Sequence, residues 1–154
     1  MSVTLAPLPP DAHDRVRHLE VADSQLDFVA AIEQMLGEPT PGVDFHGIST
    51  GDEAVGFFKI DPPGVSCFDF VAADALGLRG LLVGAQYQGK GYGGAAMAAL
   101  PAYLRARYDA PRAMLSVDDS NPVAHRLYLA HGWVDTGELH HGRAGPAPVL
   151  QLTL

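Results

Sequence analysis

The sequence predicts a mixed α/β fold in which helices lie on the faces of a sheet. Short apolar runs, which are typical of strands, alternate with longer segments whose apolar residues recur at helical spacing. A glycine-rich stretch joins one apolar run directly to a long helical segment, and two strand-like runs follow the last helix. At 154 residues the chain has the size of one ordinary domain, so we expect residues 1–154 to form a single domain.

The N-terminal half is expected to contain a strand, two helical segments and a hairpin. Residues 3–8 (VTLAPL) are an apolar run stopped by prolines, and a polar helical segment follows it. Residues 24–36 (SQLDFVAAIEQML) have apolar residues at helical spacing, with Ser24 in the position of an N-cap. Residues 44–61 contain two strand-like runs around a Gly-Asp turn, which predicts a hairpin.

The next part of the chain is expected to form a strand, a long helix and a second strand. Residues 76–84 are continuously apolar near their end, which is typical of a buried strand. Residues 92–108 have the composition of a long helix, and Pro101 within them removes one backbone hydrogen bond and should bend that helix. Residues 112–117 (RAMLSV) are again strand-like.

The last helix has start and stop signals at both of its ends. Asn121 is in the cap position, Pro122 is in the first turn, and Gly132 lies just past the last turn. The runs at residues 133–139 (WVDTGEL) and 148–154 (PVLQLTL) are expected to be the final strands.

The charge balance of the chain is acidic, with 18 Asp and Glu against 10 Lys and Arg and a net charge of −8. Non-specific binding of nucleic acid depends on Lys and Arg that neutralise phosphates, so we expect no nucleic-acid partner. An acidic surface favours a cationic substrate such as an amine, or it serves solubility alone, and composition leaves both open. The N-terminus lacks a signal-peptide pattern and no run is long enough to span a membrane, so we expect a cytoplasmic protein without a membrane partner.

The stretch VGAQYQGKGYGG, residues 83–94, contains five glycines and matches more than one phosphate-binding pattern. Its G-x-x-x-x-G-K run is the body of a triphosphate loop, but Gly91 stands where that motif needs Ser or Thr to hold Mg²⁺. Its G-x-G-x-x-G run fits a dinucleotide fold with Asp118 as the ribose-binding acid, but too few residues follow it for the second half of such a fold. A third pattern, Q-x-x-G-x-G, begins at Gln88.

A second group of residues lies on the helix that follows the next strand. Asn121, Ala124, His125 and Tyr128 are spaced i, i+3, i+4 and i+7, so they share one helix face. A capping amide and a phenol therefore point the same way, beside the strand and the glycine loop. The spacing alone favours Tyr128 as a core aromatic of an amphipathic helix, and a role in a site needs further support.

Two motifs resemble the signatures of the GNAT N-acetyltransferases. NPVAHRLYLAHGW, residues 121–133, resembles the second signature N-x-x-A-x-x-L-Y-x-x-x-G-F, with Trp133 in place of the usual Phe. LLVGAQYQGKGYG, residues 81–93, resembles the first signature, and its Q-x-x-G-x-G pattern is the one with which the family holds the pyrophosphate of acetyl-coenzyme A. Upstream, SQLDFVAAIEQML, VGFF and LRGLLV resemble the branch that contains bacterial diamine and polyamine acetyltransferases.

The resemblance implies a GNAT fold, which has a central, mostly antiparallel twisted sheet with splayed central strands and helices on both faces. It implies an N-acetyltransferase that moves acetyl from acetyl-coenzyme A, as co-substrate, to a primary amine of a polyamine-like small molecule or a peptide, by direct attack. No metal is expected. The family often dimerises, and the apolar run at residues 148–154 is compatible with a homodimer.

The resemblance also implies roles for individual residues. Tyr128 is expected to stabilise the leaving thiolate, and a backbone N–H near Leu82–Val83 the developing oxyanion. The strand edge that ends at Val83 is expected to pair with the peptide-like pantetheine arm, and the helix that begins near Tyr92 to direct its N-terminus at the pyrophosphate. The expected cofactor-binding residues are Leu82, Val83, Gln88, Gly89, Lys90, Gly91, Tyr92, Gly93, Gly94, Asn121 and Tyr128.

The sequence does not identify the base that deprotonates the amine. Many relatives have a carboxylate on the central strand, whereas residues 76–83 contain Arg79 as their one charged residue. A substrate amine of low pKa would need no base at all. Otherwise the candidates are Asp69, Asp74, Asp118 and Glu138.

The remaining reactive residue types are not expected to take part in the chemistry. The seven histidines fit no metal-binding spacing, so we interpret them, including His140 and His141, as surface or capping residues. Cys67, the single cysteine, lies in a loop far from both motifs and is a poor candidate for a nucleophile. A second class of function stays open: a non-catalytic module that binds coenzyme A or a dinucleotide.

Overall fold

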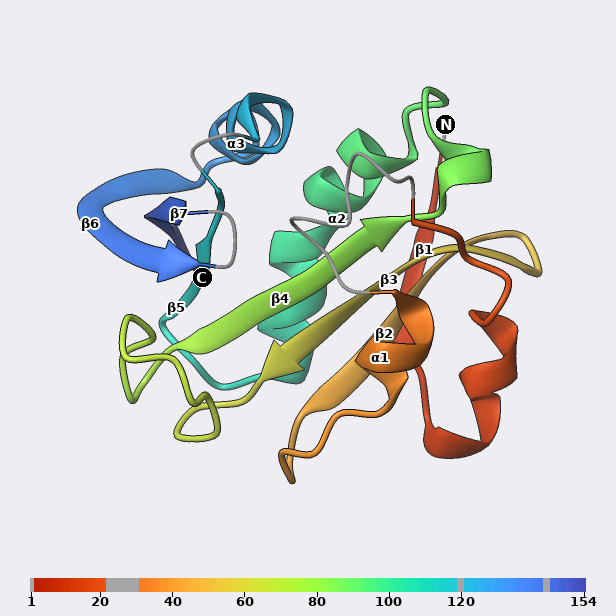
Figure 1. Cartoon of the computed structure of the whole chain (residues 1–154), viewed down its shortest axis with the longest axis horizontal. Helices are drawn as coiled ribbons and strands as arrows, with labels where there is room; N and C mark the ends of the chain where they lie inside the picture. Colours follow the sequence, from red (N-terminus) through yellow and green to blue (C-terminus); the bar gives the residue numbers. More distant parts are fainter. Residues whose placement is uncertain (1, 22–30, 119–120, 143–144) are drawn as a thin grey trace.

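The computed structural model describes residues 2–21, 31–118, 121–142 and 145–154. Within these ranges seven strands form one sheet in the order β1-β2-β3-β4-β5-β7-β6, with helices packed against it (Figure 1). Neighbouring strands are antiparallel, except that β4 and β5 run parallel. The predicted mixed, mostly antiparallel sheet is therefore confirmed.

The N-terminal half contains the predicted strand, helical segments and hairpin. Its elements are β1 (Thr4–Pro7), the 3₁₀ helix η1 (Pro10–Arg15), α1 (Ile32–Leu36), β2 (Asp44–Thr50) and β3 (Glu53–Asp61). The hairpin prediction is confirmed, because β2 and β3 pair in antiparallel register up to Thr50 and Glu53. The described end of the helix predicted over residues 24–36 is helical, and its proposed cap, Ser24, lies outside the described residues.

The C-terminal half follows the predicted order of elements. It contains β4 (Leu76–Val83), the 3₁₀ helix η3 (Ala85–Tyr87), α2 (Tyr92–Arg107), β5 (Arg112–Ser116), α3 (Pro122–Leu129), β6 (Val134–Gly142) and β7 (Gly145–Thr153). α2 continues through Pro101. β6 is longer than the predicted run at residues 133–139, because the polar residues that follow it pair with the start of β7.

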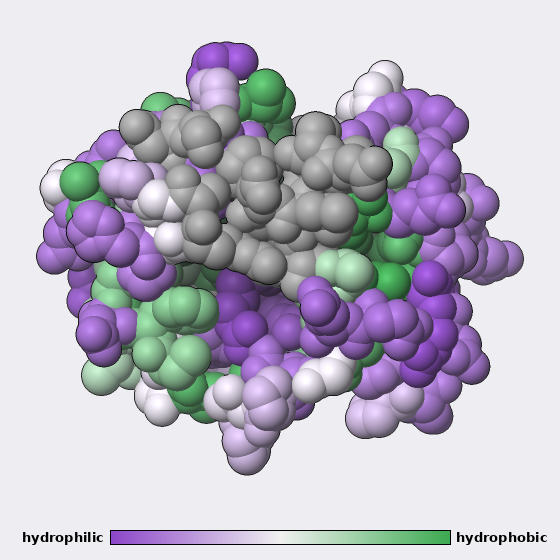
Figure 2. Space-filling model, viewed as in Figure 1, coloured by the Kyte–Doolittle hydropathy of each residue, from purple (hydrophilic) through white to green (hydrophobic). Residues whose placement is uncertain are grey.

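Helices cover both faces of the sheet, and Figure 1 shows α1 in front of the strands and α2 behind them. Phe57 and Phe58 illustrate the two cores, because successive strand residues point to opposite faces. Phe58 packs in the core that contains α2 and α3, whereas Phe57 packs in the core that contains α1. On the face of the molecule seen in Figure 2, hydrophilic residues cover much of the periphery and hydrophobic residues form smaller groups between them.

The ends of α3 are formed as the sequence predicted. The Asn121 side chain accepts a hydrogen bond from the Ala124 N–H at 3.5 Å, and Pro122 is the first helical residue. Gly132, just past the helix, has φ of +94°, a conformation that L side chains rarely adopt. These caps fix the direction in which α3 presents Tyr128 to the sheet.

The two central strands separate after their first residues, as the resemblance implied. β4 pairs with β5 through Leu76 and Gly77, and the rest of β4, which is fully described, has no further register pair with β5. β4 also bulges against β3, because Gly80 and Leu81 together stand opposite the single residue Phe58. Gly80 takes the left-handed backbone conformation at this bulge, with φ of +65°. The splay leaves one edge of β4 unpaired.

Candidate active site

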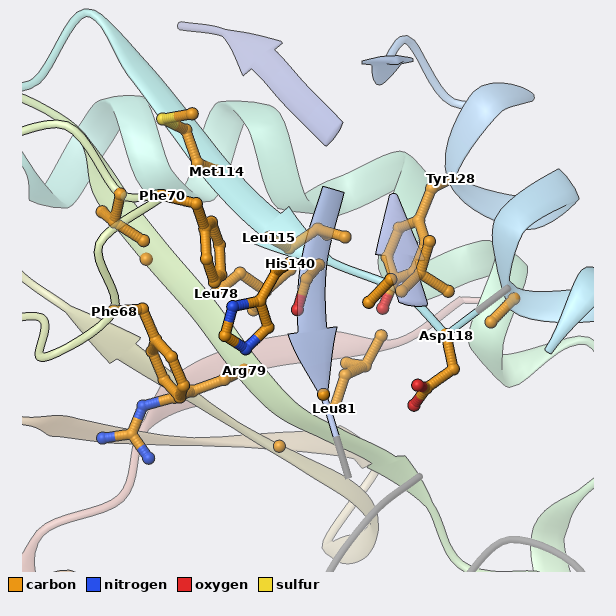
Figure 3. A pocket seen from close by; sticks show the side chains of 18 of the residues that line it. Phe68, Phe70, Leu78, Arg79, Leu81, Met114, Leu115, Asp118, Tyr128 and His140 are labelled. Atoms are coloured by element: carbon orange, nitrogen blue, oxygen red, sulfur yellow. The ribbon is translucent and has the colours of Figure 1, made fainter. Parts of the chain in front are cut away.

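The splay between β4 and β5 opens into a cavity of about 450 Å³, which we refer to as the splay cavity. Side chains from β4, β5, α3, β6 and the loop between β3 and β4 converge on it (Figure 3). Most of this lining is apolar or aromatic. Its ionisable side chains are Asp61, Arg79, Asp118, Tyr128, His140 and His141.

Two further cavities adjoin the splay cavity through shared residues. The loop cavity, of about 500 Å³, lies at the glycine-rich loop before α2. The outer cavity, of about 940 Å³, lies against β6 and β7. The splay cavity shares Leu81, Asn121, Ala124 and Tyr128 with the loop cavity, and Phe70, Met114, His140 and His141 with the outer cavity. The three cavities therefore form a continuous series with the splay cavity in the middle.

Nine of the eleven residues expected to bind the cofactor line the loop cavity. They are Leu82, Val83, Gln88, Gly89, Gly91, Tyr92, Gly93, Asn121 and Tyr128. Lys90 and Gly94 are also described by the structure but do not belong to this lining, and Lys90 is exposed. The residues of the two motifs thus form one wall of the loop cavity, and Lys90 is not part of it.

The glycine loop reaches α2 through two left-handed residues, Gly89 with φ of +77° and Gly91 with φ of +85°. Gly91 is the N-cap of α2, and the first turn of that helix begins at Tyr92. The Gln88 side chain ties the loop to the end of β4, because its Nε2 donates to the Val83 carbonyl at 3.0 Å. The helix therefore starts beside the loop cavity, with its free backbone N–H groups close to the cavity wall.

Tyr128 lies where the loop cavity and the splay cavity meet. Its side chain is buried, with 8% of its surface exposed, and burial raises the pKa of the phenol above its ordinary value. The ring also packs against Trp133 in the core beneath α3. Tyr128 is therefore a core aromatic residue that also lines the two cavities.

Arg79, the one charged residue of β4, is bound by buried acids. Its Nε lies 3.0 Å from an oxygen of Asp61, and its Nη1 lies 2.7 Å from Glu38. Lys59 Nζ lies 2.9 Å from the same Glu38 oxygen. Burial would raise the pKa of Glu38, but the hydrogen bonds from Arg79 and Lys59 outweigh it and lower that pKa to about 2. The cluster contains two acids, Glu38 and Asp61, and two cations, Lys59 and Arg79, so its charges balance. The Asp61 carboxylate is therefore already paired with Arg79.

The four carboxylates considered as bases lie in different places. Asp118 lines the splay cavity together with Tyr128. Asp69 and Glu138 line the outer cavity. Asp74 is half exposed, forms an ion pair with Arg112 at 3.0 Å, and belongs to neither lining. The structure thus separates candidates that the sequence left equal.

Two histidines contradict the interpretation of all seven as surface or capping residues. His46 on β2 is buried, and its ring nitrogens hydrogen-bond to the hydroxyls of Tyr103 at 2.6 Å and Tyr108 at 2.9 Å. His140 on β6 lines the splay cavity and contacts Phe68 and Phe70. That interpretation was wrong because these partners are distant in the chain, and no local pattern indicates them.

Among the described residues, no group of three or more His, Cys, Asp or Glu side chains is placed to hold a metal ion. None of the described helices has the length and apolar character needed to cross a membrane. Cys67 is exposed and lies outside the three cavity linings.

The splayed central strands and the glycine loop that opens α2 are the features that the GNAT resemblance implied. A model of the acetyltransferase (GNAT) family matches residues 11–133, which is most of the chain. The chain belongs to the GNAT family. It is an acetyl-coenzyme A-dependent N-acetyltransferase. A search of curated proteins gave no match.

Solved structures of several acetyltransferases have the same fold. The aminoglycoside acetyltransferase AAC(6')-Ib in complex with coenzyme A and kanamycin gives a TM-score of 0.78 at 19% identity, covering 99% of this chain and 95% of that chain. The spermidine N-acetyltransferase from Vibrio cholerae, in complex with coenzyme A and spermine, gives 0.72 at 14% identity, covering 99% and 95%. An acetyltransferase from Thermus thermophilus gives 0.67 at 21% identity, covering 100% and 98%. Because proteins with different amines share this fold, the likeness does not select an acceptor.

Proposed function

We propose that the protein transfers acetyl from acetyl-coenzyme A to a primary amine of a polyamine-like small molecule or a peptide, by direct attack. The observation that carries this proposal is the place of Tyr128, at the junction of the loop cavity and the splay cavity. A cofactor in the loop cavity and an amine in the splay cavity would meet beside its hydroxyl. When bound, acetyl-coenzyme A supplies the thioester whose carbonyl carbon the amine attacks.

The loop cavity fits the anionic end of coenzyme A. The N-terminus of α2 offers backbone N–H groups and the positive end of the helix dipole, and glycines at 89, 91 and 93 leave room for phosphate. The chain has a net charge of −8, and Lys90 lies outside the cavity lining. We therefore assign phosphate binding to backbone dipoles rather than to charged side chains.

The unpaired edge of β4 fits the peptide-like arm of the cofactor. The Gly84 N–H donates to the Val55 carbonyl of β3 at 2.9 Å. Successive residues of a strand direct their N–H groups to opposite edges, so the Val83 N–H points to the edge that β5 leaves free. Amide groups of pantetheine can pair along this edge, and the Val83 N–H is the donor that we assign to the developing oxyanion.

Tyr128 is assigned to the leaving sulfur. Burial raises the pKa of its phenol, so the hydroxyl keeps its proton at neutral pH. It acts as a hydrogen-bond donor to the thiolate and does not need to give up that proton. Such a bond strengthens as charge develops on sulfur, so it lowers the barrier more than it tightens cofactor binding.

The charges of the acceptor side favour a cationic amine. Asp118 lies in the splay cavity, and Asp69 and Glu138 lie in the outer cavity. The cations of these two linings, Arg79 and Arg112, are each paired with an acid. Acids therefore outnumber cations along the acceptor side, and such a surface attracts an ammonium group.

Free thiol release from acetyl-coenzyme A, measured against a panel of primary amines, tests this proposal. Thermal shift with acetyl-coenzyme A, NADH and ATP precedes it. We expect stabilisation by acetyl-coenzyme A alone and thiol release that depends on the amine. Stabilisation without amine-dependent release would instead support a non-catalytic coenzyme A-binding module, and stabilisation by NADH a dinucleotide-binding one.

A further inference from the structure

The imidazole of His140 projects from β6 into the splay cavity (Figure 3). Two aromatic rings of the loop between β3 and β4 hold it. The ring centroid of Phe68 lies 5.6 Å away at an interplanar angle of 85°, and that of Phe70 lies 5.0 Å away at 50°. Within the described ranges no hydrogen bond to the His140 nitrogens is formed, so they are available to a molecule in the cavity.

His140 also stands on the route that an acceptor would take. With Phe70, Met114 and His141 it lines both the outer cavity and the splay cavity. The loop cavity, on the other side of the series, is the one assigned to the cofactor. An amine that approaches Tyr128 from the outer cavity therefore passes the His140 ring, and Figure 3 shows Tyr128 entering the splay cavity from the side opposite Phe68 and Phe70.

An alkylamine acceptor needs a base beside the thioester. An alkyl ammonium, whose pKa lies near 10, has no lone pair with which to attack until it loses a proton. β4 offers no carboxylate, and Asp61 is bound by Arg79 through two hydrogen-bonding nitrogens. An imidazole is a stronger base than a carboxylate, because it changes protonation near neutral pH. These facts favour a histidine that faces the cavity over an acid in the same wall.

We propose that His140 is the base that takes the first proton from the acceptor ammonium. An N–H bond of the ammonium breaks and an N–H bond forms on the imidazole, which later passes that proton to water. The freed lone pair forms the new C–N bond as the C–S bond breaks. The second proton leaves nitrogen as the amide forms and ends on the thiolate. Ammonium and thioester thus give amide, thiol and one proton. This inference rests on the proposed function.

Other charged groups surround His140 and set the conditions of the test. Arg79 lies behind Phe68, with its guanidinium carbon 5.9 Å from the centre of that ring. Titratable and charged residues line the same cavities from β3, the loop before β4, β4, β5 and the segment after it, α3 and β6 itself. They are Asp61, Asp69, Arg79, Arg112, Asp118, Tyr128, Glu138 and His141. Because several of these titrate, a pH profile alone would not identify His140, and the acceptor must be varied instead.

The experiment compares two acceptors in the wild type and in His140→Gln. One is the most active alkylamine of the panel, and the other is its analogue with a trifluoromethyl group on the amine-bearing carbon, which is largely neutral at pH 7. We expect kcat/KM to fall about a hundredfold for the alkylamine and to stay near the wild-type value for the fluorinated amine. His13→Gln, a histidine of η1 that lines none of the three cavities, is the control and should change neither. His141→Gln, the adjacent imidazole in the same cavity linings, is assayed beside it.

Each other outcome overturns a distinct statement. An equal fall in kcat/KM with both amines would mean that His140 serves packing. Unchanged kcat/KM values in His140→Gln would mean that another group takes the ammonium proton, and Asp118→Asn would be the next variant. A selective loss in His141→Gln would move the role to that residue. His140→Ala should regain activity toward the alkylamine on addition of free imidazole, and failure of this rescue also counts against the proposal. A wild type that acetylates no amine would overturn the proposed function itself.

Discussion

The phenol ring of Tyr128 lies against the indole of Trp133, with ring centroids 5.7 Å apart and an interplanar angle of 66°. This edge-on contact holds the Tyr128 ring from the core side while its other side lines the two cavities. The ring packs in the core, whereas the hydroxyl is the group that we assign to the reaction. A substitution that removes only the hydroxyl therefore tests the proposed role without disturbing the packing.

Tyr128→Phe is expected to lower turnover and to leave the rest of the protein unchanged. It keeps the ring on Trp133 and removes the donor to the developing thiolate. Loss of that hydrogen bond should cost about 1.5–3 kcal/mol of transition-state stabilisation, or roughly ten- to a hundredfold in kcat. The dissociation constant of acetyl-coenzyme A and the melting temperature should stay the same, because the thioester sulfur is a poor acceptor before the reaction. Wild-type turnover in this variant would remove Tyr128 from the mechanism.

Gly93→Val is expected to abolish cofactor binding with the fold kept. Gly93 lies in the first turn of α2 and lines the loop cavity, and a Cβ there would only reach van der Waals contact with Leu127 at 3.7 Å. The branched methyl groups would occupy the space assigned to phosphate. Calorimetry should show at least a hundredfold weaker binding of acetyl-coenzyme A.

Gly94→Ala is the matched control for this position. Gly94 is the next residue of the same helix, does not line the loop cavity, and a Cβ there would meet nothing within 4 Å. It should bind acetyl-coenzyme A like the wild type. Gly91→Val is less informative, because Gly91 has φ of +85°, which strains any L side chain. A loss of affinity in that variant could come from misfolding as well as from a blocked phosphate site. Equal affinities in Gly93→Val and Gly94→Ala would place the phosphates elsewhere.

Asp61→Asn is expected to destabilise the fold strongly. Asp61 is almost fully buried and pairs with the partly buried Arg79, so its neutralisation leaves that cation without one of its partners. A loss of about 3 kcal/mol is expected, which is a fall of about 6–12 °C in Tm for a chain of this size. Asp74→Asn breaks the half-exposed pair with Arg112 and should cost less than about 1 kcal/mol. Similar denaturation midpoints for the two variants would show that burial adds nothing to the Arg79 pair.

His46 is expected to make folding stability depend on pH. Burial lowers its pKa from 6.5 to about 4, so the folded protein keeps the imidazole neutral. Between these two pH values the unfolded chain binds a proton that the folded chain does not. The stabilisation is complete above pH 6.5 and is lost as the pH falls toward 4, by up to about 3 kcal/mol.

Urea denaturation of the wild type and His46→Gln at a series of pH values measures this effect. Gln keeps a donor and an acceptor for Tyr108 and Tyr103 but cannot take up a proton, so the free energy of unfolding of this variant should fall less between pH 6.5 and 4. His141→Gln, an exposed histidine, should retain the wild-type slope. A His46→Gln curve parallel to that of the wild type would assign the slope to other groups.

The loop cavity, to which we assign the cofactor, could be predicted from the sequence because its signals are local. The caps of α3 and the left-handed glycines before α2 follow from short-range backbone rules, and these bring Asn121, Tyr128 and the loop together. The place of Lys90, which is exposed and outside this lining, could not be predicted, because it depends on the backbone path of a loop, which no periodicity encodes.

The acceptor side could not be predicted in the same way. His140 reaches the cavity only because β6 pairs with β7, and its contacts Phe68 and Phe70 belong to a loop without a regular pattern. Likewise, the partners of Arg79 come from β3 and from the segment before β2, so the electrical balance of the cluster appears only in three dimensions. Long-range pairing decides these features, and a single sequence does not display it.

β7 lies between β5 and β6 in the sheet, although the ribosome makes it after both. A nascent chain that has emerged as far as β6 already contains the glycine loop and Tyr128. At that stage β5 still has an unpaired edge, and β6 lacks β7, the strand with which it pairs. We expect the surface assigned to the nucleotide to form first, and the wall with His140 to close only when residues 145–153 insert. Cofactor capture and amine acetylation would thus arise at separate moments of synthesis.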